Sequence, residues 1–116
     1  MSANRDMPSV AAPISGGNTS MLIFTGVKAF VDCSLEDGSD VSDVWQRKLE
    51  ERGAKVVQRW PGAAAKLTHL VWQNGKVPKR AQQALLYGIP VCGVDWVEDC
   101  IAIGRRLDEF EYQATW

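Results

Sequence analysis

The segment Gly93-Val94-Asp95-Trp96-Val97-Glu98-Asp99-Cys100 decides the fold that this sequence predicts. Asp95 is expected to cap the amides at the start of a short helix, and Glu98, three residues later, completes a capping box. One face of that helix is apolar and carries Trp96, Val97, Cys100 and Ile101. A bulky indole on such a stripe is typical of a core residue, so we expect a structural role for it.

Strand and helix patterns alternate along the rest of the chain. Strand patterns cover residues 27–33, 54–59, 67–72 and 90–93. Three helices accompany them: from an N-cap at Ser42 to Gly53, from Pro78 to Gly88 with Ala81, Ala84 and Leu85 inward, and from Trp96 to Gly104. Two strand-helix-strand crossovers require a mostly parallel sheet covered on both faces. The predicted fold class is therefore a small three-layer α/β domain, a four-stranded mostly parallel sheet flanked by three helices.

Length and composition predict one intracellular globular domain. The 116 residues are 46% hydrophobic and 23% charged, with no apolar run long enough to span a membrane and no signal-peptide pattern. Residues 1–20 are rich in small and polar residues and are expected to form a disordered tail. The domain is expected at residues 21–113, with 114–116 as a short end, and the chain is interpreted as a fragment of a longer protein.

Cysteine and histidine usage argues against a metal site, a disulfide framework and catalysis. Cys33, Cys92 and Cys100 lack paired spacing, and their odd number fits buried reduced thiols. The single histidine, His69, has no suitably spaced nucleophile and orienting acid, so it is expected to be structural, bonding loop backbone together with Thr68. Glycine-rich phosphate loops are missing from the sequence. We therefore expect no metal, no cofactor, no catalytic residue and no enzymatic activity.

The charges are segregated along the chain. The net charge is −1, yet residues 54–94 contain no acid, and the flanking segments hold all 14 acids. The cations of the acid-free stretch are Lys55, Arg59, Lys66, Lys76, Lys79 and Arg80. Two interpretations stay open: an ordinary solvated surface, or a surface that binds phosphate or nucleic acid.

Several residues together resemble the BRCT family over about residues 21–112. They are Phe24-x-Gly26, Gly53, Thr68-His69-Leu70-Val71, Gly88 and Trp96-x-x-x-Cys100. The resemblance implies that Phe24, Gly26, Gly53, Thr68, Trp96 and Cys100 are structural core positions. Within the family, this chain most resembles one particular member domain. The residues that carry this closer resemblance are the run from Val27 through Gly53-Ala54-Lys55-Val56 and the Asn74-Gly75 turn.

The resemblance also implies a function. It predicts a non-enzymatic interaction module of a nuclear protein of DNA-damage signalling, replication or chromosome condensation. The phosphate pocket of such modules would correspond here to the hydroxyl of Ser34, an adjacent amide, and Arg80 with Lys79 beside it. A helix N-terminus, a cation and a hydroxyl would together bind a phosphorylated or acidic partner segment. Leu35 departs from the family pattern, where glycine often follows the hydroxyl residue, and Arg80 replaces the usual lysine.

Trp60 and Lys76 are further partner-binding candidates. Trp60, beside Pro61, is either an exposed anchor for a partner or a lid over the sheet edge. Trp45 and Trp72 are expected in the core. Alternatives for the whole chain are a DNA-binding BRCT domain, a phosphate-independent BRCT pairing surface, and an enzyme of flavodoxin-like topology, which the missing cofactor loops disfavour. A second BRCT domain elsewhere in the full-length protein is a further partner that the resemblance implies.

Overall fold

The computed structural model describes residues 22–61 and 66–116, so the expected tail, residues 1–20, lies outside the described residues. The elements in chain order are β1 (Lys28–Cys33), α1 (Ser42–Glu50), β2 (Lys55–Val56), β3 (His69–Gln73), α2 (Pro78–Leu86), β4 (Val91–Cys92), α3 (Val94–Ile103) and the 3-10 helix η2 (Glu109–Tyr112). Within these described ranges, no helix has the length and hydropathy needed to cross a bilayer.

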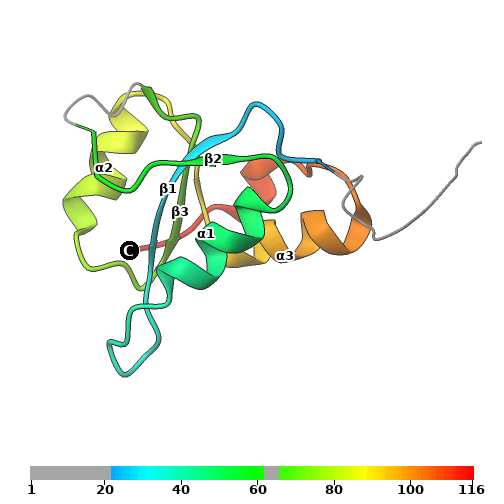
Figure 1. Ribbon diagram of the computed structural model, residues 1–116. Coiled ribbons are helices and arrows are strands. Elements are labelled where there is room, and N and C mark those ends of the chain that lie inside the picture. The colour runs from blue at the N-terminus through cyan, green and yellow to red at the C-terminus, as the bar shows by residue number, and fades with distance from the viewer. Residues whose placement is uncertain (1–21, 62–65) are drawn as a thin grey trace, which may run out of the picture.

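The four strands form one sheet in the order β2-β1-β3-β4, and all neighbouring pairs are parallel. Helices α1 and α3 lie on one face of the sheet, whereas α2 lies on the other (Figure 1). This confirms the predicted three-layer α/β fold with four strands and three helices. The parallel pairing is possible because α1, between β1 and β2, and α2, between β3 and β4, return the chain to the end of the sheet where the preceding strand began.

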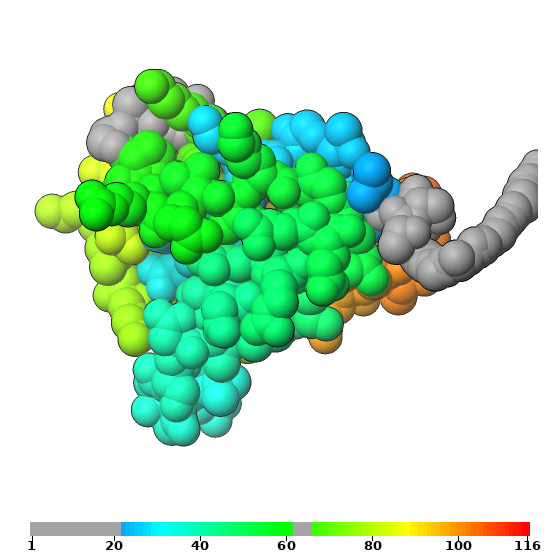
Figure 2. Space-filling view, viewed as in Figure 1, coloured from blue at the N-terminus to red at the C-terminus, as the bar shows by residue number. Residues whose placement is uncertain are grey.

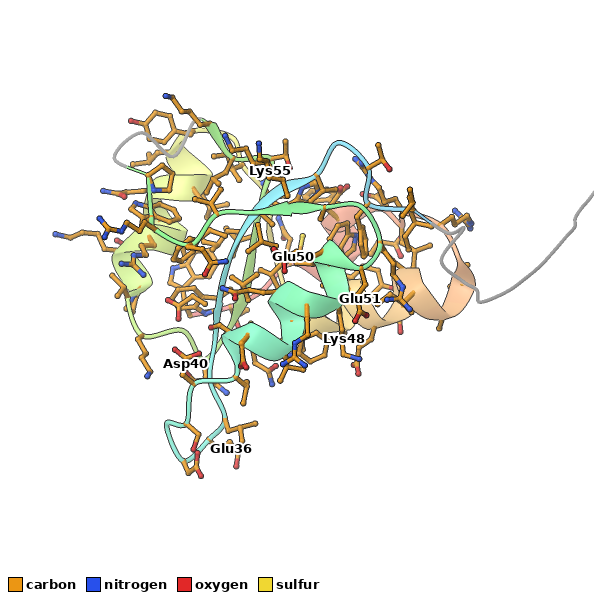
Figure 3. The ribbon with its side chains drawn as sticks, in the orientation of Figure 1. Glu36, Asp40, Lys48, Glu50, Glu51 and Lys55 are labelled. Atoms are coloured by element: carbon orange, nitrogen blue, oxygen red, sulfur yellow. The ribbon has the colours of Figure 1, made fainter. Side chains whose placement is uncertain are left out.

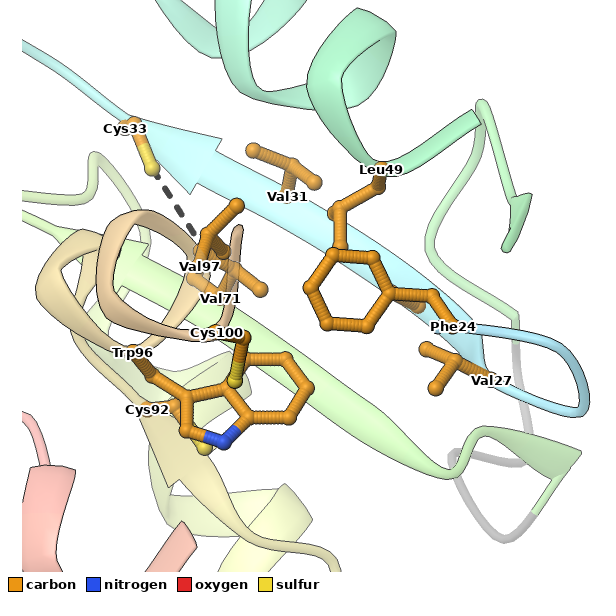
Figure 4. Close-up of a cluster of buried hydrophobic side chains, with 11 residues drawn as sticks. Phe24, Val27, Val31, Cys33, Leu49, Val71, Cys92, Trp96, Val97 and Cys100 are labelled. Atoms are coloured by element: carbon orange, nitrogen blue, oxygen red, sulfur yellow. Dashed lines mark hydrogen bonds between the residues drawn. The ribbon is translucent and has the colours of Figure 1, made fainter. Parts of the chain in front are cut away.

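The core between the sheet and helices α1 and α3 is built around Trp96 (Figure 4). Trp96, Phe24 and Leu49 are each fully buried, and the Phe24 and Trp96 rings lie 5.2 Å apart. The Trp96 indole Nε1 donates a hydrogen bond to the Leu107 carbonyl at 3.0 Å. Cys100 is also buried, so the predicted apolar face of α3 is confirmed.

A second core lies between the sheet and α2. Ala81 and Ala84 of α2 are buried against Phe30 of β1 and Leu70 and Trp72 of β3. Because side chains alternate along a strand, Ala29, Val31 and Cys33 of β1 face the other core. Asp32 has the same parity as Phe30 and therefore faces α2.

Three local predictions were wrong. Ser42 is the first residue of α1 and not its N-cap, because its Oγ bonds the amide and carbonyl of Cys33 at 2.9 and 3.3 Å. Helix α3 begins at Val94 after Gly93, so Asp95 lies in the first turn and is not the N-cap; its carboxylate accepts a hydrogen bond from the Trp96 amide at 3.1 Å, but the capping box does not form. Leu85 is 49% exposed, because α2 is covered by the sheet on the Ala81 side only.

Three of the predicted core residues are structural without being buried. Gly26 and Gly53 are exposed and adopt φ of +90° and +98°, a region that favours glycine. A Cβ at Gly53 would also lie 2.9 Å from Thr25 Oγ1. Thr68 is exposed as well, and its Oγ1 accepts a hydrogen bond from the Lys28 amide at 2.7 Å. These positions stabilise backbone conformation and pairing rather than the apolar core.

The end of the chain pairs with β4. The Ala114 amide bonds the Val91 carbonyl at 2.9 Å, and Gln113 forms an antiparallel bridge with Cys92. The Trp116 ring packs edge-on against Trp72, with centroids 6.3 Å apart. The segment predicted as a separate end, residues 114–116, therefore contacts the same core as α2.

Candidate partner-binding site

A cavity of about 290 Å³ opens between β1, α1 and α2. Its lining comes from four parts of the chain: Phe30, Val31 and Asp32 of β1, Asp40, Ser42 and Gln46 around the start of α1, Gln58, and Lys76, Val77 and Arg80 at the start of α2. In Figure 2 the light-blue residues of β1 are visible between α1 and α2. The cavity lies at the carboxyl end of β1, where ligands of open α/β sheets commonly bind.

The Asp32 side chain accepts hydrogen bonds from the backbone amides that precede α2. Its carboxylate accepts hydrogen bonds from the Lys76 amide at 3.1 and 3.2 Å and from the Val77 amide at 3.4 Å. The side chain is buried, with 6% exposure. Amides just before the first turn of a helix attract anions. In this domain the anion is the chain's own carboxylate.

Asp40 adds a second carboxylate to the cavity. Figure 3 shows Asp40 where the loop after β1 returns toward α1, with Glu36 at the tip of that loop. The hydrogen bond from the Ser42 amide, 2.8 Å long, lowers the pKa of Asp40 below its usual value. Lys76 Nζ lies 3.8 Å from Asp40 Oδ2. Lys76, a predicted partner-binding residue, is thus an exposed cation with a carboxylate beside it.

Arg80 lies over two aromatic rings at the cavity. Its guanidinium carbon is 5.1 Å from the Phe30 ring centroid and 5.8 Å from that of Trp60. Within the part of the chain that the structure describes, Arg80 makes no ion pair within 4.0 Å. Stacking on aromatic rings restricts the side chain while leaving the guanidinium donors available.

Trp60 is half-buried against the sheet. It meets Phe30 edge-on at 5.3 Å and donates from Nε1 to Gln83 Oε1 at 3.1 Å. This placement agrees with the prediction that Trp60 covers the sheet, and partner contact by its exposed part stays a prediction.

The structure does not bring all of the predicted phosphate-binding residues together. Ser34 is 3% exposed and does not line the cavity; its Oγ has no hydrogen-bond partner among the described residues. The amides of Ser34 and Leu35 donate to Gln73 and Ser39 carbonyls. Lys79 is exposed and also does not line the cavity, which leaves Arg80 as the predicted phosphate ligand that does.

Sequence reasoning missed Asp32 and Asp40. The stretch that contains Lys76 and Arg80 has no acid of its own, but the fold places two carboxylates from the acidic flank beside them. The alternation of β1 could have revealed Asp32, because Phe30 is apolar and inward on the α2 side. Asp40 follows a loop whose path the sequence pattern does not determine.

His69 has partners that sequence reasoning did not identify. Its Nε2 lies 2.6 Å from Glu109 Oε2 and its Nδ1 lies 2.8 Å from Thr68 Oγ1. Both residues were expected to bond loop backbone, but Thr68 bonds the backbone of Lys28 at the start of β1, and the His69 ring bonds two side chains. The His69 ring is 3% exposed and stacks on Trp96, which agrees with a structural role. In the described ranges, no group of three or more His, Cys, Asp or Glu residues could hold a metal ion.

A second cavity, of about 440 Å³, lies at the carboxyl ends of β3 and β4. Its lining is Trp72, Gln73, Asn74, Gly93, Val94, Asp95, Gln113, Ala114 and Thr115. It contains none of the predicted site residues and no basic side chain. We therefore place the candidate partner-binding site at the cavity of Arg80.

Comparison with known proteins identifies the family. The family described as "BRCA1 C Terminus (BRCT) domain" matches residues 19–101. No curated protein matches the sequence at a significant level.

Solved structures share the fold. The first BRCT domain of the DNA-repair protein XRCC1 is 24% identical with a TM-score of 0.65, covering 100% of this chain and 83% of that one. The BRCT domain of human DNA repair protein REV1 is 22% identical with a TM-score of 0.60, covering 88% of this chain and 99% of that one.

A third structure contains a bound phosphopeptide. Rad4 BRCT1,2 in complex with a Crb2 phosphopeptide is 14% identical with a TM-score of 0.64, covering 81% of this chain and 48% of that one. At these identities the likeness shows the fold alone. The family match, together with the parallel sheet and the Trp96 core, shows that this chain belongs to the BRCT family.

Proposed function

We propose that this domain is a non-catalytic protein-interaction module that binds an anionic segment of a partner, either acidic or phosphorylated. The site is the cavity of Arg80, with Lys79 and Lys76 on the neighbouring turn. The observation that carries the proposal is the stacked Arg80 guanidinium, which has aromatic support and no carboxylate partner among the described residues.

The charges around the cavity support this proposal. The negative charge of Asp32 is stabilised by the two amides that precede α2. The negative charge of Asp40 is stabilised by the Ser42 amide and by Lys76. Arg80 and the exposed Lys79 then remain as the cations available to a ligand. An arginine held in place loses less conformational entropy when it binds a carboxylate or phosphate in a bidentate manner.

The cellular setting is part of the same proposal. We propose a nuclear protein of the DNA-damage response, replication or chromosome condensation, which agrees with the DNA-repair proteins among the structural relatives. The run from Val27 through Gly53-Ala54-Lys55-Val56 and the Asn74-Gly75 turn resemble the N-terminal BRCT domain of microcephalin. A second BRCT domain in the full-length protein would act beside this one.

NMR shift mapping with phosphoserine peptides, their unphosphorylated acidic twins and a short DNA duplex tests the proposal. We expect saturable shifts at Arg80 and Lys79 with acidic peptides, and Arg80→Glu should weaken binding at least about tenfold. Arg47→Glu is the matched control, because Arg47 is an exposed cation on α1 paired with Asp43.

Two results would contradict the proposal. Equal peptide affinity for Arg80→Glu and the unmodified domain would remove this site. Binding of the duplex alone, weakening steeply with salt, would instead favour DNA recognition through released counterions.

A further inference from the structure

The backbone amides just before α2, which could bind an anion, already bind the side chain of Asp32. Three contacts, between 3.1 and 3.4 Å, join the Asp32 carboxylate to the amides of Lys76 and Val77. The carboxylate is 6% exposed, so it is covered by protein rather than turned to solvent. These amides are the backbone donors that a phosphate at this helix end would require.

The strand geometry keeps Asp32 in that position. Side chains of β1 alternate, and Phe30, which has the same parity, is 7% exposed in the α2 core. Asp32 pairs with Trp72 in the parallel register of β1 and β3, near the end of β3, and α2 is the next helix along the chain. Moving the carboxylate away would leave two amides without partners and a buried charge without donors.

A phosphate could not share this position. It would bring about two negative charges next to the Asp32 carboxylate, in a cavity that the Asp40 carboxylate also lines. Repulsion and the loss of both amide donors would remove the advantage that phosphate usually has over a carboxylate. The side chains of Arg80 and Lys79 can still bind anions at the rim.

We infer that Asp32 fills the backbone anion position beside Arg80, formed by the Lys76 and Val77 amides, so that partner recognition depends on carboxylates contacting Arg80 and Lys79 and gains nothing from phosphorylation. This inference rests on the proposed function for the identity of the ligand. It specifies the acidic, unphosphorylated segment as the ligand class. It also makes Asp32 the residue that determines this specificity.

Titration with inorganic phosphate at constant ionic strength tests the occupied position directly. The readout is the NMR shift of the Lys76 and Val77 amides in the unmodified domain and in Asp32→Ser, which removes the carboxylate and opens space. We expect no saturable shift in the unmodified domain and an apparent affinity at least about tenfold higher in Asp32→Ser. Asp43→Asn, which removes an exposed carboxylate on α1, should behave like the unmodified domain.

Each outcome of this titration either supports or overturns the inference. Saturable phosphate binding at Lys76 and Val77 in the unmodified domain would overturn the inference, as would a folded Asp32→Ser variant that ignores phosphate. Asp32→Asn keeps the side-chain shape and one acceptor oxygen, so it supports the same comparison if Asp32→Ser does not fold. We then expect Asn to give an intermediate gain in phosphate affinity, and no gain would overturn the inference.

Peptides distinguish this inference from the proposed function. A phosphoserine peptide and its twin with glutamate in that place should bind the unmodified domain within about threefold of each other. Asp32→Ser should shift the ratio toward the phosphopeptide. If the unmodified domain prefers the phosphopeptide tenfold or more, the inference about Asp32 is overturned and the proposed function is not. If neither peptide binds, the proposed function is overturned, and the phosphate titration decides the inference about Asp32.

Discussion

The imidazole of His69 stacks on the indole of Trp96, with ring centroids 4.8 Å apart and planes inclined by 19°. His69 belongs to β3 and Trp96 to α3, so the stack joins the central sheet to the helix that covers it. The Glu109 carboxylate, 2.6 Å from His69 Nε2, extends this cluster to η2. Two sequence features that carried the family resemblance are therefore parts of one buried cluster.

The cluster predicts a loss of stability in acid. Burial lowers the pKa of His69 below 6.5, and the hydrogen bond and charge of Glu109 oppose this only in part. Burial acts to raise the pKa of Glu109, but the hydrogen bond from His69 is among the interactions that hold it below 4.5. The unfolded chain therefore binds protons more readily at both groups, and folding stability should fall as the pH drops from about 6.5.

Thermal unfolding from about pH 8 to about pH 4 checks this prediction. The Tm should be level above pH 6.5 and decrease below it, first through His69 and then through Glu109. His69→Gln should flatten the first part of the decrease. A Tm that rises between neutral pH and pH 5.5 would show instead that the charged pair stabilises the fold, contrary to the stated pKa direction.

Truncation of Trp96 should remove most of the domain's stability. Trp96→Ala removes a fully buried indole with two ring contacts, an expected loss of about 3–5 kcal/mol. Trp96→Phe keeps a ring but leaves the Leu107 carbonyl without its donor, a loss of about 1–3 kcal/mol. Urea unfolding measures both, and an unchanged midpoint for Trp96→Ala would contradict the core described here.

Two glycines with similar φ separate backbone strain from steric contact. Gly38 has φ +90° and nothing within 4 Å of an added Cβ, so Gly38→Ala should cost about 1–2 kcal/mol through its backbone alone. Gly53 has φ +98°, and its Cβ would meet Thr25 Oγ1 at 2.9 Å. Gly53→Ala should therefore destabilise more in the same urea experiment; equal losses would show that the loop around Thr25 moves freely.

The three thiols should be unreactive in the folded domain. Burial, reinforced by nearby charge, raises the pKa of Cys33 and of Cys92 to about 12, and burial also raises that of Cys100. Thiolate is the reactive form, so a colorimetric disulfide reagent should react slowly until urea unfolds the chain, and then with all three residues. Fast reaction of one thiol under native conditions would identify a local opening.

Part of the site could be predicted from local sequence. The helix start predicted at Pro78 puts Arg80 in the first turn of α2, where the structure also has it. The family resemblance implies a ligand role for Ser34, but it cannot show that the chain buries this hydroxyl and uses the following amide, that of Leu35, in its own loop. The missed groups, Asp32 and Asp40, come close to Lys76 only because the carboxyl end of β1 and the starts of α1 and α2 meet in space.

The sequence by itself determined the elements and the fold class, because apolar periodicity, glycine at positive φ and proline at a helix start act over a few neighbouring residues. Gly104 ends α3 as the sequence predicts, whereas the start of α3 and the cap of α1 depend on contacts with distant residues: the Gly93 amide bonds the Tyr112 carbonyl, and Ser42 bonds Cys33 rather than its own helix. Tertiary structure alone decided which charges share the cavity. Electrostatic partners are set by distance in space, and the carboxylate of Asp32 reaches Lys76 across 44 positions of the chain.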